Sequence, residues 1–118
     1  MSGITSYHAG LCAEDAVARD YVRRGRSVVQ RRWRGKGGEI DLILADGDGL
    51  IFVEVKKSCS HGRAAQSLSR RQMDRISMAA SEFLGTQPRG QLTDVQFDLA
   101  TVNDVGEIAI LENAFQEF

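Results

Sequence analysis

The sequence predicts an α/β fold in which helices flank a mixed sheet. Two observations favour this fold: a helical segment precedes three strand-like segments, and a second helical segment precedes two more strands. The order α-β-β-β-α-β-β suits an α/β sandwich rather than a doubly wound sheet. The chain has 118 residues, of which 42% are apolar, so we expect one domain over residues 1–118 with a buried core.

Both predicted helices have apolar side chains at helical spacing. The first covers 11–25 and ends at a glycine, and its apolar side is Leu11, Val17, Ala18, Tyr21 and Val22. The second follows the stretch 69–72, SRRQ, which has capping-box spacing, and it ends before Gly85. Its inward side chains are expected to be Met73, Ile76, Ala80, Phe83 and Leu84.

Strands are predicted at 27–33, 95–102, 107–114 and in both halves of the stretch 38–58, GEIDLILADGDGLIFVEVKKS. The two halves meet at 46–49, DGDG, which is typical of a hairpin turn. Centring this turn between Gly47 and Asp48 pairs residues whose numbers sum to 95. The register places Asp41 opposite Glu54 and Glu39 opposite Lys56.

These four polar residues form a candidate active site. Alternation along each strand directs Glu39 and Asp41 to one face of their strand, and likewise Glu54 and Lys56. Two carboxylates directly opposite each other repel. A protonated acid or a Glu39–Lys56 ion pair would offset this in part. A divalent cation would do so more fully, because Mg²⁺ favours one or two carboxylates together with phosphate and water. A solvated salt-bridge face is the open alternative.

Glu14 is a further candidate ligand. It lies on the apolar side of the first predicted helix, where a carboxylate is costly unless it is paired or bound to metal. We expect it to reach the hairpin directly or through water. The predicted metal ligands for Mg²⁺ or Mn²⁺ are Asp41, Glu54, Glu14 and Glu39, and the predicted catalytic residues are Asp41, Glu54 and Lys56. Lys56 would orient a water or stabilise developing negative charge.

Basic residues concentrate in two segments although the net charge is −1. Residues 23–36 contain basic residues and no acid, and a second basic group follows the hairpin. Such a distribution favours one basic face for phosphates, with solvated charge as the alternative. The predicted DNA contacts are Arg31, Arg32, Arg34, Lys36, Lys57, Arg70, Arg71 and Arg75. Trp33 would stack on a base or be buried in its strand, and Asp98 is expected to be a structural acid.

The motif GEIDLI…DG…FVEVK resembles the YraN-like family (UPF0102) of the PD-(D/E)XK nuclease superfamily. The segments AEDAVARDYVRRG, FDLA and ENAF resemble other parts of the same family, so that the similarity covers nearly the whole chain. The resemblance implies a restriction-endonuclease-like core, with Asp41 as the first-motif Asp and Glu54-Val55-Lys56 as the ExK motif. It extends to archaeal Holliday-junction resolvases, in which an acid of the first helix joins the set as Glu14 would here. The chain departs from the family pattern at Gln72, where Lys is common, and at 57–58. Both changes concern DNA contacts rather than the metal set.

The function favoured by these observations is a metal-dependent DNA endonuclease of low sequence specificity, with branched or structured DNA as one substrate class. A nucleic-acid-binding module without turnover and a protein-interaction domain are the alternatives. A homodimer stays open, since many nucleases of this fold cut two strands as dimers. No run of about 18 apolar residues and no secretory signal is present, so we expect a cytoplasmic protein without a membrane span. Cys12 and Cys59 have no CxxC partner, and both are expected to be buried.

Overall fold

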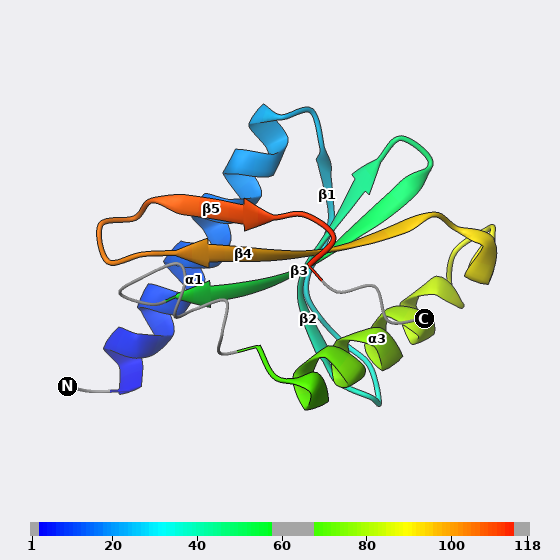
Figure 1. Cartoon of the computed structure of the whole chain (residues 1–118), viewed down its shortest axis with the longest axis horizontal. Coiled ribbons are helices and arrows are strands. Elements are labelled where there is room, and N and C mark those ends of the chain that lie inside the picture. Colours follow the sequence, from blue (N-terminus) through cyan, green and yellow to red (C-terminus); the bar gives the residue numbers. More distant parts are fainter. Residues whose placement is uncertain (1–2, 58–67, 115–118) are drawn as a thin grey trace.

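Five strands form one sheet that carries a helix on each face (Figure 1). This computed structural model describes residues 3–57 and 68–114, with side chains described from Cys12 onward. The helices are α1 (Gly3–Arg23) and α3 (Arg70–Leu84). The strands are β1 (Ser27–Arg34), β2 (Glu39–Asp46), β3 (Gly49–Lys57), β4 (Val95–Val102) and β5 (Ile108–Leu111), and a short 3-10 helix, η1, covers Gly90–Leu92. The predicted α/β fold and its element order are confirmed.

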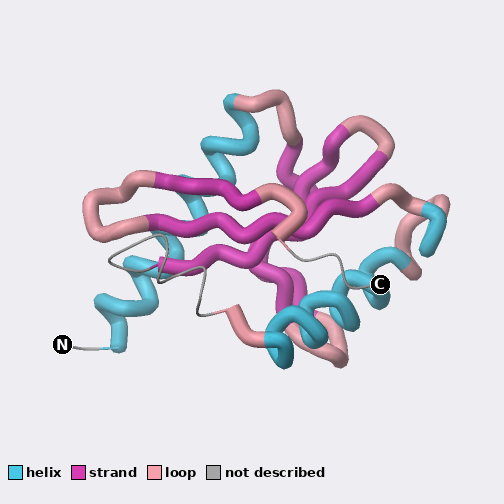
Figure 2. The backbone as a smooth tube through the Cα atoms, in the orientation of Figure 1, coloured by secondary structure: helices cyan, strands magenta, loops and turns pink. Residues whose placement is uncertain are grey.

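The sheet is mixed and strongly twisted. Its strand order is β1-β2-β3-β4-β5, with β3 and β4 parallel and the other neighbours antiparallel. In Figure 2, β3, β4 and β5 run side by side while β1 and β2 cross them steeply. Neither helix in the described part of the chain is both long and apolar enough to cross a membrane.

The two helices bury separate clusters against the sheet. Ile76, Ala79, Ala80 and Phe83 of α3 pack with apolar residues of β2, β3 and β4, including Phe52. On the other face, Ala13, Val17, Ala18 and Tyr21 of α1 pack on Leu42, Leu44, Ile51 and Val53. Burial of this apolar area is the main force that holds both helices on the sheet.

Trp33 belongs to the α3 side of the core. It packs against the buried cluster there, and its ring meets Phe83 edge-on with 5.4 Å between the ring centroids. Of the two roles open to Trp33, the structure therefore supports burial.

The hairpin register matches the prediction. Pairs from Asp46–Gly49 to Leu42–Val53 all sum to 95, and the turn is the two-residue loop Gly47-Asp48. Gly47 has φ +61°, a left-handed conformation that glycine adopts without strain.

The helix ends are partly as predicted. The capping box is present, because the Gln72 N–H donates to Ser69 Oγ at 3.1 Å and the Ser69 N–H donates to Gln72 Oε1 at 3.0 Å. Gly85 follows α3, but with right-handed φ −60° rather than the left-handed conformation common at helix ends. α1 begins at Gly3, earlier than expected.

Two burial predictions on α1 are wrong. Val22 is 52% exposed, because it lies at the margin of the face that Tyr21 and Ala18 bury. Cys12 is also exposed, next to the buried Ala13, so its side chain points away from the sheet. Cys59 lies outside the described residues.

Candidate active site

Asp41 lies where β2 and β3 separate. The paired residues of the two strands end at Leu42 and Val53, whereas β3 continues to pair with β4 as far as Lys57. In the gap, the Asp41 carboxylate accepts the Val55 backbone N–H at 2.8 Å. A side chain therefore replaces the missing strand as the acceptor for β3.

The alternation of β2 breaks at Asp41, opposite an irregular residue of the neighbouring strand. Regular alternation would put Ile40 and Leu42 on one face, but Ile40 packs in the α3 cluster and Leu42 in the α1 cluster. Arg32, whose two neighbours in β1 pair with Leu42 and Ile40, has φ +53°, a strained conformation for a residue with a side chain. The backbone twist there leaves Asp41 on neither face but in the gap between β2 and β3.

Glu54 shares this gap with Asp41. The pKa of Glu54 is raised to about 9. Burial is the largest cause, followed by a side-chain hydrogen bond with Asp41 and by the negative charge of Asp41. Two carboxyl groups in contact cannot both ionise without cost. In the absence of a cation, Glu54 therefore holds a proton in neutral solution.

Lys56 is the nearby positive charge. Its charge lowers the pKa of Glu54, but by less than burial and Asp41 raise it. The structure thus brings together the three residues predicted to be catalytic.

Glu14 approaches the same point from α1. Burial raises its pKa first, the charges of Asp41 and Glu39 raise it further, and Arg31 and Arg32 lower it. The acid of the first helix is therefore within electrostatic reach of the hairpin acids, as its position in the sequence predicted.

Glu39 does not have the partner that the hairpin register suggested. The β2–β3 pairing stops before it reaches Glu39, and the β1–β2 register places Arg34 opposite. Glu39 accepts a hydrogen bond from Arg34 at 2.9 Å and lies 3.7 Å from the Arg32 Nε. The predicted Glu39–Lys56 pairing is wrong because the nearer strand supplies the cations.

A hollow of about 200 Å³ separates these acids from α3. Glu39 and Glu54 line one side, Gln72 and Arg75 line the other, and Gly38 and Ile76 complete it. Since the Oε1 of Gln72 accepts the Ser69 N–H, its Nε2 is the group that can donate to a ligand. The hollow thus has acids on one side and hydrogen-bond donors on the other. The sequence predicted Gln72 to be a helix-cap residue and to stand where the family commonly has a DNA-contacting Lys, and its place in the hollow adds to both roles.

The donor set suits a small, hard cation. Among the described residues, no three His, Cys, Asp or Glu side chains are arranged to hold a metal ion. Mg²⁺ does not need such a cage, because it binds one or two carboxylates and retains water or phosphate. Asp41 and Glu54 provide two half-buried carboxyls that repel when ionised. They would hold the ion, with Glu14 next to them.

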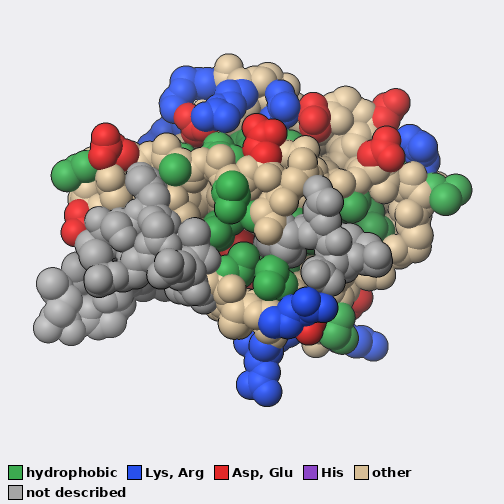
Figure 3. All heavy atoms as spheres, viewed as in Figure 1, with side chains coloured by type: hydrophobic (Ala, Val, Ile, Leu, Met, Phe, Trp, Pro, Cys, Tyr) green, Lys and Arg blue, Asp and Glu red, His purple; other side chains and the backbone are tan. Residues whose placement is uncertain are grey.

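The predicted DNA-binding arginines of β1 are engaged by acids. Arg31 is hydrogen-bonded to Asp15 of α1, and Arg34 and Arg32 pair with Glu39. On α3, Arg70 pairs with Asp74 at 3.3 Å. Lys36, Lys57 and Arg71 are exposed, and Arg75 lines the hollow. Figure 3 shows basic side chains gathered around the upper end of the molecule, with acidic side chains among them.

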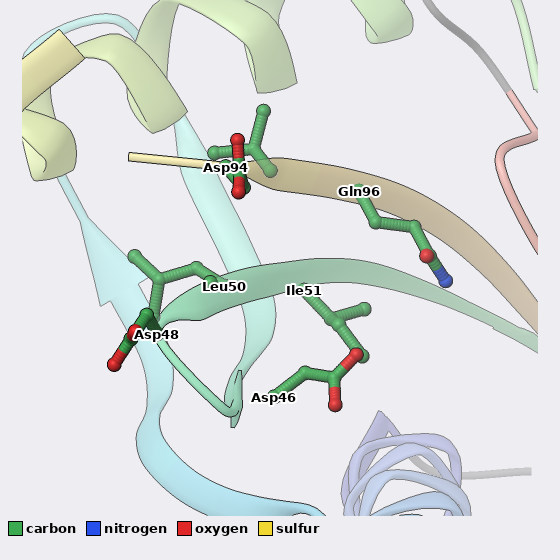
Figure 4. A pocket seen from close by; sticks show the side chains of 8 residues that line it. Asp46, Asp48, Leu50, Ile51, Asp94 and Gln96 are labelled. Atoms are coloured by element: carbon green, nitrogen blue, oxygen red, sulfur yellow. The ribbon is translucent and has the colours of Figure 1, made fainter. Parts of the chain in front are cut away.

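A larger hollow of about 400 Å³ lies at the opposite end of β3 (Figure 4). Asp46 precedes the hairpin turn there, Asp48 lies in the turn, and Asp94 precedes β4. Asp46 lies 3.3 Å from the Arg26 Nε, which accounts for one of these acids. We place the candidate site at the strand gap instead, since there burial and the neighbouring Asp41 raise the pKa of Glu54.

Asp98 is a structural acid, as predicted. It is fully buried and accepts hydrogen bonds from the Tyr21 hydroxyl at 2.6 Å, Gln96 Nε2 at 2.8 Å and the Asn113 N–H at 3.2 Å. It joins α1, β4 and the segment after β5, so its donors satisfy it within the fold.

Comparison with known proteins gives the family. The model of a family described as "Uncharacterised protein family UPF0102" matches residues 13–102. A UPF0102 protein of Cereibacter sphaeroides is 64% identical over 115 residues, which cover 98% of each chain. A UPF0102 protein of Ruegeria pomeroyi is 54% identical over 113 residues, covering 96% of this chain and 92% of the relative. A third, from Roseobacter denitrificans, is 47% identical over 116 residues, covering 98% of this chain and 90% of the relative. The chain therefore belongs to the uncharacterised protein family UPF0102.

Proposed function

We propose that this protein is a metal-dependent DNA endonuclease of the PD-(D/E)XK nuclease superfamily, which hydrolyses phosphodiester bonds with low sequence specificity. The observation that carries the proposal is the contact of the Asp41 and Glu54 carboxyls in the gap between β2 and β3, with Lys56 next to Glu54. Two carboxyl groups in contact cannot both ionise without cost. Their presence is better explained by a ligand that needs them than by folding alone.

The residues have separate tasks in the proposed reaction. Asp41 and Glu54 would hold a Mg²⁺ or Mn²⁺ ion, which would polarise a phosphoryl oxygen and lower the pKa of a water. The water oxygen bonds to phosphorus while the bond to the leaving sugar oxygen breaks. The attacking water gives its proton to solvent, and the leaving oxygen takes one from solvent. Lys56 orients the attacking water or stabilises the negative charge.

The proposed DNA contacts are mainly to the backbone. Arg75 and Gln72 lie across the hollow from Glu54 and face a phosphate held at the acids. The arginines of β1 and the exposed Lys36, Lys57 and Arg71 supply charge for flanking phosphates. Backbone contacts carry no sequence information directly, so specificity is expected to follow DNA shape. Branched or structured DNA is a substrate class that such contacts distinguish.

One observation favours the alternative of a protein-interaction domain. Arg31, Arg32 and Arg34 are paired with acids, as in a salt-bridge network that stabilises a protein-interaction surface. DNA binding must displace or share these partners. Cleavage and binding therefore have to be measured separately.

A cleavage panel tests the proposal. Wild-type protein and Glu54→Gln are incubated with duplex, single-stranded, flapped and four-way DNA of two unrelated sequences, with Mg²⁺, Mn²⁺ or chelator. Glutamine is nearly the same shape as the protonated acid, so the variant should fold. We expect metal-dependent cleavage by wild type only, with similar products on both sequences. DNA binding without cleavage would support the binding module, and neither binding nor cleavage would support an interaction domain.

A further inference from the structure

The loop that connects β1 and β2 is fixed to α3 by one carboxylate. Glu82 accepts the Lys36 backbone N–H at 2.9 Å through Oε2 and the Gly37 backbone N–H at 2.7 Å through Oε1. The residues joined are 45 and 46 positions apart in the sequence. Both oxygens of a single side chain therefore hold two consecutive amides of a distant loop.

The glycines of this loop allow it to lie directly on the helix. A Cβ at Gly37 would lie 3.0 Å from the Met78 Cβ, and one at Gly38 would lie 3.3 Å from the Arg75 carbonyl oxygen. Arg75, Met78 and Glu82 are spaced so that they share one face of α3. The loop thus follows α3 for about two turns, with Glu82 at one end and Arg75 at the other.

The Arg75 end of this contact is the candidate site. Gly38 is the last residue of the loop and Glu39 follows it, and both line the hollow with Gln72 and Arg75. The position of the loop along α3 therefore sets the separation between the acids of the sheet and the donors of the helix.

Glu82 itself takes no part in the core. Its side chain is exposed, whereas Ile76, Ala79, Ala80 and Phe83 hold α3 on the sheet. The two backbone hydrogen bonds lower the pKa of Glu82, so it stays ionised in neutral solution. Removing the carboxylate should release the loop without releasing the helix.

We propose that Glu82 is a positioning residue, which holds the 35–38 loop on α3 and so fixes the width of the hollow. That width is the separation of Glu39 and Glu54 on the sheet from Gln72 and Arg75 on α3. Its kinetic consequence rests on the proposed nuclease function, but the contact and its effect on the hollow do not. Glu82 does not touch the reacting atoms, so it acts through the geometry of the groups that do.

The test compares Glu82→Ala and Glu82→Gln with Asp74→Ala, a control that removes an exposed acid from the same helix. Amide hydrogen exchange at Lys36 and Gly37 and the NMR shift of the Arg75 Nε–H report on the loop and the hollow. Melting temperature, DNA affinity without metal, and cleavage rate are measured on the same proteins.

In Glu82→Ala we expect faster exchange at both amides, a shifted Arg75 Nε–H and nearly unchanged melting. The kcat should fall about 10-fold, because small displacements of positioned groups cost this much or more, while DNA affinity should change less than about 2-fold. Glu82→Gln, which keeps one acceptor oxygen, should be intermediate, and Asp74→Ala should match wild type.

Unchanged amide exchange at Lys36 and Gly37 in Glu82→Ala would overturn the proposal, and so would faster exchange with an unchanged Arg75 Nε–H shift. An equal loss in Asp74→Ala would overturn it too, because it would indicate a general charge effect. Cleavage that stays at the wild-type rate despite a shifted Arg75 Nε–H would also contradict it. If wild type cleaves no substrate, the nuclease proposal fails, and the two NMR measurements still decide whether Glu82 sets the hollow.

Discussion

The Asp41 carboxylate accepts the Val55 backbone N–H at 2.8 Å, at the point where the pairing of β2 and β3 ends. This bond fixes Asp41 in the gap and at the same time satisfies the backbone of the strand that carries Glu54. Removing the carboxyl would leave a half-buried N–H without its acceptor, which costs about 1–3 kcal/mol. Asparagine keeps an acceptor oxygen and loses only the charge, so it is the informative substitution.

The stability of the metal-free protein should fall as pH rises. Folded Glu54 keeps its proton up to about pH 9, whereas the unfolded chain loses it near 4.5, so the folded state binds more protons between these values. The free energy of unfolding therefore decreases with pH across this window. Glu54→Gln removes the titrating group and should give a flatter dependence.

Urea denaturation of both proteins in chelator, from pH 5 to pH 9, measures this difference. Identical slopes for wild type and Glu54→Gln would show that Glu54 is ionised in the folded protein and does not share a proton with Asp41.

Much of this site follows from local sequence, and the errors have identifiable causes. The turn at Gly47-Asp48 sets the register, and the register brings Asp41 and Glu54 together. Nothing in the sequence marks the left-handed conformation of Arg32 or the break in alternation opposite it, where Asp41 leaves the face that alternation predicts. Contacts such as Glu82 with the 35–38 loop depend on how a helix docks on a distant loop, which spacing alone does not encode.

Glu39 shows the same limit within one sheet. The partner of Glu39 was predicted from the β2–β3 hairpin. The strand on the other side of β2, which is β1, supplies Arg34 and Arg32 instead. A strand between two others has two sets of cross-strand partners, and a turn in the sequence identifies only the partners across the hairpin.

Charge reversal of Arg31, Arg32 and Arg34 together should weaken DNA binding and flatten its salt dependence. The slope of log K against log salt should decrease by about 0.9 for every phosphate that these arginines neutralise on duplex DNA, because fewer counterions are released. Affinity is measured from about 50 to 200 mM salt, the range in which phosphate neutralisation changes affinity strongly. Arg89→Glu, an exposed arginine near η1, is the control.

Because the reversed side chains would face Asp15 and Glu39, melting curves must first show that the triple variant is folded. An unchanged slope in a folded variant would move the DNA surface to Arg70, Arg71 and Arg75.

Tyr21→Phe should destabilise the fold without affecting the site. It removes the 2.6 Å hydrogen bond to the buried Asp98, at a cost of about 1–3 kcal/mol. Urea denaturation should show this loss, while DNA affinity and Mg²⁺ response stay at wild-type levels. Val22→Ala on the exposed side of α1 is the control and should have little effect. A stable Tyr21→Phe protein with altered Mg²⁺ response would place Asp98 in the site rather than in the core.

Asp41→Asn should separate metal binding from folding. Asparagine keeps an acceptor for the Val55 N–H and removes the charge that helps to raise the pKa of Glu54, so the metal-free protein should be as stable as wild type or slightly more stable. The same change should remove most of the rise in melting temperature caused by Mg²⁺, because the ion stabilises the folded state by binding to it. A strong loss of stability without metal, together with an intact Mg²⁺ response, would make Asp41 a structural partner.

Nicking of supercoiled DNA by wild type and Asp41→Asn tests the central claim most directly. Both proteins are purified identically, with Asp46→Asn, which alters an acid at the far end of the same strand, as the control. We predict that wild type and Asp46→Asn nick DNA with Mg²⁺ or Mn²⁺ and not with chelator. We further predict that Asp41→Asn loses the activity by orders of magnitude and still binds DNA in the absence of metal. Equal nicking by Asp41→Asn and wild type would contradict the assignment of the active site to the gap between β2 and β3.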